Sequence, residues 1–176
     1  MEHSFEPIID DRSRLLILGS LPGVRSLMEN EYYANRQNKF WKIIFSVFAR
    51  PFCTDYLSKV LLLHDHNIAL WDVIKSADRI GSSDSNIKAA IANDIPKLLQ
   101  DHPGISFIIF NGQFAFKSYR NFFGKPQPPF EVLLSTSPAC AGRDAEKFEM
   151  WERAVKGALE DTLKSFTAPS EKRSFG

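Results

Sequence analysis

Two stretches near the amino terminus hold residue types that can bind a planar ring. The turn Gly19–Gly23 reads Gly-Ser-Leu-Pro-Gly and follows directly on the apolar run Arg14–Leu18. The segment Tyr32–Trp41 then places aromatic rings, carboxamides and two cations within ten residues. Aromatic faces can stack a flat ring, carboxamides can hydrogen-bond its edge, and cations can hold a phosphate. A turn followed by an amphipathic helix with core-filling aromatics fits the same residues.

Polar residues also follow three later apolar runs. These are Asp72 after Ile68–Trp71, Asn111 after Ile105–Phe110, and Ser135–Arg143 after Phe130–Leu134. Carboxyl ends of parallel strands meet at one edge of a sheet, so we expect these groups around one pocket, with Tyr33 available to stack. This set holds no histidine and no Gly-x-x-x-x-Gly-Lys phosphate loop. It suits cleavage of an N-glycosidic bond, in which the base leaves as a stabilised anion.

The elements that must position these residues alternate along the chain. The four apolar runs predict strands, and the segments between and after them predict helices over Phe40–Phe48, Tyr56–His64, about Ser85–Gln100, Ala115–Phe123 and about Asp144–Ser165. Near-continuous apolar strands alternating with helices predict an α/β fold, a three-layer αβα sandwich around a central four-stranded parallel sheet. We expect residues 1–166 to form one domain and 167–176 to be a flexible tail.

The net charge and the cysteine and histidine content limit which partners and cofactors we expect. The 176 residues carry a net charge of +1, so any DNA contact must come from a local cluster such as Arg25, Arg36, Lys39 and Lys42. Two distant cysteines predict reduced thiols. His64 and His66 face apart on a helix, so we expect no metal site and no cofactor. We also expect no membrane segment, a cytoplasmic location and a monomer.

Five blocks of the sequence, taken in order, resemble the uracil-DNA glycosylase superfamily, and its hypoxanthine-DNA (deoxyinosine) glycosylase branch above others. The blocks are Gly19–Gly23, Tyr32–Trp41, Leu70–Val73 with Arg79–Ser82, Phe110–Gly112 and Ser135–Ala139. The resemblance runs from about Leu15 to Ala158. It implies a DNA repair enzyme that flips a deaminated base out of the duplex and hydrolyses its N-glycosidic bond, leaving an abasic site.

The resemblance also implies roles for individual residues. Leu21 stands where most of the superfamily has a catalytic Asn or Asp, and the hypoxanthine branch places its important Asn at Asn38. Tyr33 falls where an aromatic ring stacks on the flipped base. Arg36 and Cys140 depart from the branch pattern, which has Pro and Asn there. The loop Ser135–Ala139 falls where the superfamily contacts the DNA backbone and minor groove, which implies such contacts for Ser135, Ser137, Pro138 and Ala139. From their charge, Lys39 and Arg143 are further candidates for DNA contact, and Arg143 could instead fill the gap left by the base.

Recognition of the base can be argued from donors and acceptors. Asp72 can accept the N1–H of hypoxanthine and would repel the N1 lone pair of adenine. Backbone N–H groups from Ser20 and Leu21 to Gly23 can donate to O6 as the base leaves, and Asn111 can contact the base edge. Each residue also has a simpler reading, since Asn38 suits a helix cap, Asp72 a strand-end cap and Asn111 a turn.

Two other functions fit the same residues. Uracil has a ring N–H where cytosine has a lone pair, just as hypoxanthine does relative to adenine. A mismatch-specific uracil or thymine glycosylase is therefore one alternative. A damaged-DNA-binding module without catalysis is the other, because Leu21 replaces the usual catalytic residue. We expect a monofunctional enzyme, since no lysine is placed to attack C1′ as a Schiff-base nucleophile.

Overall fold

The computed structural model describes residues 2–79, 81, 83–84 and 87–167. Its centre is a parallel sheet with the strand order β3-β2-β6-β7. The strands are β2 (Leu15–Gly19), β3 (Ile68–Asp72), β6 (Phe107–Asn111) and β7 (Phe130–Leu133). All four predicted strands are therefore present, with bounds that differ by one or two residues from those expected.

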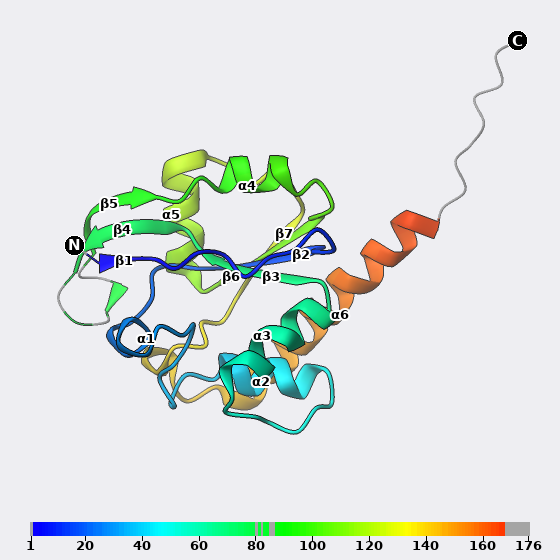
Figure 1. The fold of residues 1–176 in the computed structure, drawn as a ribbon, viewed down its shortest axis with the longest axis horizontal. Coiled ribbons are helices and arrows are strands. Elements are labelled where there is room, and N and C mark those ends of the chain that lie inside the picture. Colours follow the sequence, from blue (N-terminus) through cyan, green and yellow to red (C-terminus); the bar gives the residue numbers. More distant parts are fainter. Residues whose placement is uncertain (1, 80, 82, 85–86, 168–176) are drawn as a thin grey trace, which may run out of the picture.

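Helices cover both faces of this sheet, which confirms the three-layer αβα arrangement (Figure 1). One face carries α2 (Phe40–Val47), α3 (Tyr56–Asp65) and α6 (Asp144–Thr167), and the other carries α4 (Ile95–Asp101) and α5 (Gln113–Phe123). Side chains alternate along a strand, so Leu15 and Ile17 pack into the first core while Leu16 and Leu18 pack into the second. This two-sided burial explains the continuous apolar run of β2.

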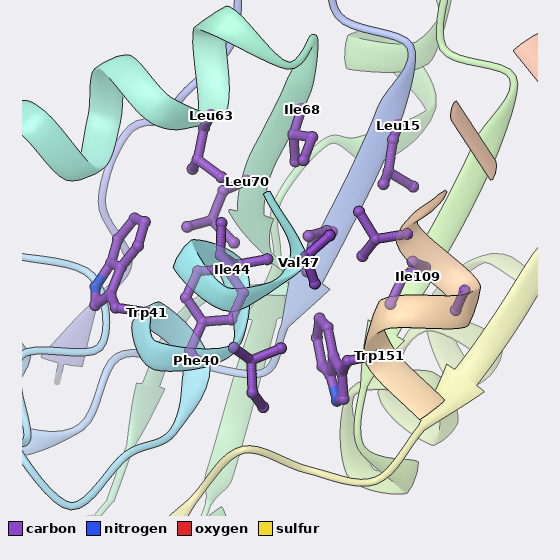
Figure 2. Packing of buried hydrophobic residues seen from close by; sticks show 14 of the residues in the cluster. Leu15, Phe40, Trp41, Ile44, Val47, Leu63, Ile68, Leu70, Ile109 and Trp151 are labelled. Carbon is purple, nitrogen blue, oxygen red and sulfur yellow. The ribbon is translucent and has the colours of Figure 1, made fainter. Parts of the chain in front are cut away.

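Two tryptophans fix the loops at the carboxyl edge of the sheet to the core. Phe40 and Trp151 meet edge to face with ring centroids 5.9 Å apart, deep in the cluster drawn in Figure 2. The indole N–H of Trp151 donates to the Leu134 carbonyl at 2.9 Å. The indole N–H of Trp41 donates to the Tyr32 carbonyl at 2.7 Å. The packed indoles therefore hold the chain at Tyr32, before α2, and at Leu134, after β7.

A second, antiparallel sheet was not predicted. It consists of β1 (Glu2–His3), β4 (Ile74–Asp78) and β5 (Lys88–Ala92) in the order β1-β4-β5. The expected helix over Ser85–Gln100 is wrong in its first part, where β5 pairs with β4 instead. Asp94 caps the shorter helix α4 by accepting from the Lys97 amide at 3.1 Å. Antiparallel pairing with the preceding strand β4 has overridden the helix propensity of an alanine-rich segment.

Two short elements complete the chain, α1 (Val24–Glu29) and the 3₁₀ turn η2 (Pro138–Cys140). Helix α6 runs through Thr167, and residues 168–176 of the expected tail, like residues 85–86 of the expected helix, lie outside the described residues. Among the helices that the structure describes, none is both long and apolar enough to cross a bilayer.

Candidate active site

A pocket of about 120 Å³ opens at the carboxyl edge of the parallel sheet. Its wall is formed by residues 19–23, Tyr32, Tyr33, Asn38, Asp72, Asp84, Asn111 and residues 135–138, with Arg25, Ser26 and Asn35 at the same cavity. Residues from six separate stretches of sequence are therefore brought together here. The volume is below the roughly 300–1,000 Å³ of pockets for drug-sized ligands, and it suits a single ring system.

Position 19, at the end of β2 and the start of the first turn, is a glycine because a side chain there would have no room. Gly19 pairs with Asp72 across β2 and β3. A Cβ on Gly19 would lie 2.4 Å from Asp72 Oδ1 and 2.8 Å from the Tyr33 hydroxyl. Both oxygens thus converge on the backbone of Gly19. Two residues further on, Leu21 is 6% exposed and packs with Ile74 and Ala77, so its side chain anchors the turn.

Tyr33 lines the pocket in a left-handed backbone conformation, with φ at 53°. This conformation is uncommon for a bulky residue. One side of the ring stacks on Phe40, with centroids 4.2 Å apart and planes 29° apart. Burial, and after it the charge of Asp72, raises the pKa of the Tyr33 hydroxyl, so this group is neutral at physiological pH.

Asn111 links two walls of the pocket. Its amide nitrogen donates to the Tyr33 hydroxyl at 3.0 Å and to the Thr136 hydroxyl at 2.9 Å. Its amide oxygen accepts from the Thr136 backbone N–H at 2.9 Å. Asn111 therefore lies at the pocket, as predicted, with its side chain engaged in holding Tyr33 and the loop after β7.

Asn38 makes a contact at the start of α2 and also lies at the pocket. Its side-chain oxygen accepts from the Phe40 backbone N–H at 2.9 Å, which is the helix-start contact of the simpler reading. The neighbouring Lys39 N–H donates to the Thr136 carbonyl at 3.0 Å and fixes the segment against the loop after β7. The residue also lines the pocket. Within the described part of the chain, its amide nitrogen has no hydrogen-bond acceptor and is available to a ligand.

Asp72 is a buried carboxyl group, 3% exposed, at the end of β3. Oδ2 accepts from the Ser4 hydroxyl at 3.2 Å, and the Asp72 backbone carbonyl accepts from the Asn93 amide at 2.8 Å. Burial and, less strongly, the charge of Asp84 raise the pKa of Asp72, the Ser4 hydrogen bond and Arg79 lower it, and the net pKa is about 7. This carboxyl group changes charge near neutral pH.

Asp84 is a pocket residue that the sequence did not reveal. Its Oδ1 accepts from the Ser20 hydroxyl at 2.8 Å, so a second carboxylate contacts the first turn. Burial raises the pKa of Asp84, and Ser20 and Arg79 oppose the rise. The only signal was the block Arg79–Ser82, which ends two residues earlier. The tertiary contact of Asp84 with Ser20 depends on the unpredicted β4–β5 hairpin.

Several predicted DNA-contacting residues surround a second cavity that adjoins the pocket through Ser137 and Pro138. Lys39 lies here and pairs with Asp144 at 3.0 Å. Cations gather at this cavity, which is also lined by Arg36, Lys42 and Lys147. The buried Lys147 donates to the Cys140 carbonyl at 2.8 Å and so braces the turn.

Two predicted residues line neither the base pocket nor the second cavity. Arg143, which directly precedes α6, pairs with Glu146 at the exposed start of that helix. Ala139 lies within η2, beyond the pocket lining, where its N–H donates to the Ser137 hydroxyl at 3.3 Å. Within the described residues, no three His, Cys, Asp or Glu side chains are grouped to hold a metal ion.

Comparison with known proteins agrees with this geometry. Two proteins named hypoxanthine DNA glycosylase are similar to the chain. One, from Methanosarcina barkeri, is 30% identical over 88% of this chain and 98% of its own length. The other, from Methanosarcina acetivorans, is 35% identical over 89% of this chain and 99% of its own length.

A solution NMR structure of a candidate uracil DNA glycosylase from Methanosarcina acetivorans has a TM-score of 0.77 and 31% identity. The match covers 90% of this chain and 98% of that one. The fold, the pocket and these relatives define a DNA glycosylase, an enzyme of DNA repair. A model of the Uracil DNA glycosylase superfamily matches residues 6–160, and the chain belongs to that superfamily.

Proposed function

We propose that this enzyme is a monofunctional glycosylase that excises hypoxanthine from DNA, with uracil as a candidate second substrate. One observation carries the proposal: Tyr33 and Asn38, which lie close together before α2, line the same pocket as Asp72 at the distant end of β3. The two relatives named hypoxanthine DNA glycosylase support the choice of base.

The first step is extrusion of the damaged nucleotide, which costs a few kcal/mol of unstacking and unpairing. Phe40 supports one side of the Tyr33 ring, and Asn111 holds its hydroxyl. A ring fixed in this way loses little freedom when a base stacks on it. Base–aromatic stacking contributes about 1–3 kcal/mol, which offsets part of the cost of extrusion.

Asp72 reads the edge of the base in this proposal. Its Oδ1 lies over the Gly19 backbone beside the Tyr33 hydroxyl, and the ionised form accepts the N1–H of hypoxanthine. Adenine presents a lone pair at N1, so the same oxygen repels it. Uracil also presents a ring N–H, at N3, that ionised Asp72 can accept. A uracil or thymine glycosylase is therefore the second candidate.

Loss of the base then requires stabilisation of its negative charge and a water molecule at C1′. Backbone N–H groups of the turn from Ser20 to Gly23 donate to O6 of the departing base. The free amide nitrogen of Asn38 hydrogen-bonds the base or orients the water. An amide is no general base, so Asn38 positions and polarises while the sugar cation forms. The bond from C1′ to N9 breaks with its electron pair on the base, and water adds to C1′.

The strand that carries the base is held by the loop after β7 and by the neighbouring cationic cavity. Ser135 and Ser137 offer hydroxyls to phosphate oxygens, with Pro138 and Ala139 shaping the loop beside them. Lys39 adds charge that is balanced by Asp144 in the free protein. We propose that Arg143, which directly precedes α6, reaches the DNA backbone. The protein is proposed to act as a monomer in the cytoplasm.

The decisive experiment uses duplex oligonucleotides with one hypoxanthine, one uracil or no lesion, followed by alkaline cleavage of abasic sites. We expect strand cleavage with hypoxanthine, and its loss in Asn38→Ala while the lesion duplex still binds. Binding to every lesion without cleavage would instead indicate a damaged-DNA-binding module. Faster cleavage of uracil or thymine mismatches would indicate the second candidate. A covalent complex trapped with borohydride would contradict a monofunctional mechanism.

A further inference from the structure

The amino-terminal segment lies directly behind the pocket. The Phe5 carbonyl accepts from the Trp71 indole at 2.9 Å, and the Glu6 carbonyl accepts from the Tyr32 hydroxyl at 3.2 Å. Ile8 forms an isolated antiparallel bridge with Leu70. Backbone contacts with β3 and with the aromatic loop therefore fix this segment, although no sequence block of the superfamily resemblance includes it.

Ser4 is the residue of this segment whose side chain contacts Asp72. Its backbone N–H donates to the Lys75 carbonyl at 2.8 Å, which holds the residue in place. Its hydroxyl lies 3.2 Å from Asp72 Oδ2 and 3.3 Å from the Phe5 carbonyl. A hydroxyl has a single proton to donate, and an ionised carboxylate is a stronger acceptor than a neutral carbonyl. Ser4 therefore donates to Asp72 when Asp72 is ionised.

The two oxygens of Asp72 then have different surroundings. Oδ2 faces Ser4 at the back, while Oδ1 faces the Gly19 backbone beside the Tyr33 hydroxyl. Other titratable groups that act on this carboxyl are Tyr32, Tyr33, Asp84 and Arg79, whose guanidinium pairs with Glu2 of β1 at 2.5 Å. Among these, the charge of Asp84 disfavours the ionised form, whereas Tyr32 and Tyr33 stay neutral where Asp72 titrates and add no charge. Ser4 and Arg79 favour the ionised form.

We propose that Ser4 is a positioning residue for base recognition. Its hydroxyl holds Oδ2 and favours the carboxylate, so that Oδ1 is turned toward the pocket as an acceptor for the ring N–H of the extruded base. This inference rests on the proposed function for its consequence in catalysis. The contact with Asp72 itself can be measured without DNA.

The test compares wild type with Ser4→Ala, Ser4→Thr and a matched control, Ser58→Ala. Ser58 also donates its hydroxyl to a carboxylate, Asp55 Oδ2 at 2.8 Å, but at the exposed start of α3. The first measurement is the titration of the Asp72 carboxyl carbon by NMR in the free protein. We expect Ser4→Ala to raise its midpoint by about one pH unit, with Ser4→Thr and Ser58→Ala close to wild type.

The second measurement is the single-turnover rate of hypoxanthine excision between pH 5.5 and 9. Loss of the Ser4 donor leaves more Asp72 protonated, so Ser4→Ala is expected to react about tenfold more slowly below pH 7 and to regain the wild-type rate near pH 9. A merely structural defect would lower the rate equally at every pH. Ser4→Thr restores the hydroxyl and is expected to restore the profile.

Different outcomes separate this inference from the proposed function. An unchanged Asp72 titration in folded Ser4→Ala would overturn the role of Ser4, whatever the enzyme excises. If Ser4→Ala shifts the Asp72 titration but the wild-type protein excises no base, the Ser4–Asp72 contact is supported and the glycosylase mechanism is refuted. If Ser4→Ala does not fold, an altered titration midpoint in Ser4→Thr contradicts the inference.

Discussion

The Tyr33 hydroxyl and the Asn111 side-chain amide, 78 positions apart in sequence, are joined by a hydrogen bond of 3.0 Å. Asn111 ends β6, whereas Tyr33 belongs to the loop before α2. The same amide group holds Thr136 in the loop after β7. One carboxamide thus fixes the proposed stacking ring relative to the loop proposed to hold the DNA backbone.

Two substitutions of Tyr33 distinguish the contribution of the ring from that of its hydroxyl. Tyr33→Phe keeps the stacking surface and loses one hydrogen bond, so we expect less than a tenfold fall in the single-turnover rate. Tyr33→Ala removes stacking worth about 1–3 kcal/mol, and we expect lesion-duplex affinity to fall about 10- to 100-fold. If Tyr33→Phe lost as much lesion-duplex affinity and as much rate as Tyr33→Ala, the site would require the hydroxyl and not the ring.

Gly19→Ala is expected to abolish excision. The added Cβ would meet Asp72 Oδ1 at 2.4 Å, so the carboxyl must move away from the base. Overpacking of this kind costs about 1–3 kcal/mol of stability. The matched control is Gly157→Ala in α6, where a Cβ has nothing within 4 Å, and it should stabilise the helix by about 0.5–1 kcal/mol. An active Gly19→Ala enzyme would contradict the proposed place of Asp72.

Two substitutions at Asn38 distinguish the helix-start contact from the chemical role. Asn38→Ala loses both, with a stability cost of about 1 kcal/mol, or roughly 2–4 °C in melting temperature. Asn38→Ser can still accept from the Phe40 N–H, though more weakly, but has no amide. We expect Asn38→Ser to melt closer to wild type than Asn38→Ala does, while both lose excision. If Asn38→Ser keeps the wild-type rate, the amide is not catalytic.

Asp72→Asn is expected to stabilise the protein in neutral and alkaline solution. The folded-state pKa is about 7 against an ordinary value of 3.8. Between these values the folded state binds more protons than the unfolded chain, so wild-type stability falls as pH rises toward 7. Above pH 7 the variant should be more stable by roughly 2–4 kcal/mol, measured by denaturant unfolding at several pH values.

A control with the opposite pH dependence is Asp55→Asn. Hydrogen bonds from Ser58 hold the pKa of Asp55 below its ordinary value, so that carboxylate contributes stability that is lost as pH falls. Asp72→Asn melting like wild type from pH 4 to pH 8 would contradict a raised pKa for Asp72.

The protonation of Asp72 should also govern base selection. Ionised Asp72 repels N1 of adenine, whereas the protonated form can donate to it. We therefore expect discrimination between hypoxanthine and adenine to weaken as pH falls below about 7. Asp72→Asn, whose amide can donate at any pH, should discriminate poorly throughout. Competition between duplexes carrying the two bases measures this ratio. A ratio that is constant from pH 5.5 to 8.5 in the wild type would refute base reading by Asp72.

The parallel sheet and the main pocket residues were accessible from sequence. Runs such as Leu15–Gly19 are apolar throughout because both faces of the strand are covered, and the turn at Gly19 marks where the run ends. Since parallel strands present their carboxyl ends at one edge, this order predicted that Asp72 and Asn111 would lie near Tyr33. Asn38 was assigned to the site from the resemblance to the superfamily. These features depend on local pattern and on the handedness rules of the fold.

Only the tertiary structure decided how those groups are held. The antiparallel sheet of β1, β4 and β5 converts a helix-prone segment into a strand, and its hairpin carries Asp84 to Ser20. The same assembly brings Ser4 to Asp72, 68 positions away. Contacts of this range leave no periodicity in the sequence, because a hydrogen bond or a shift in pKa depends on which groups meet in space and on how deeply they are buried.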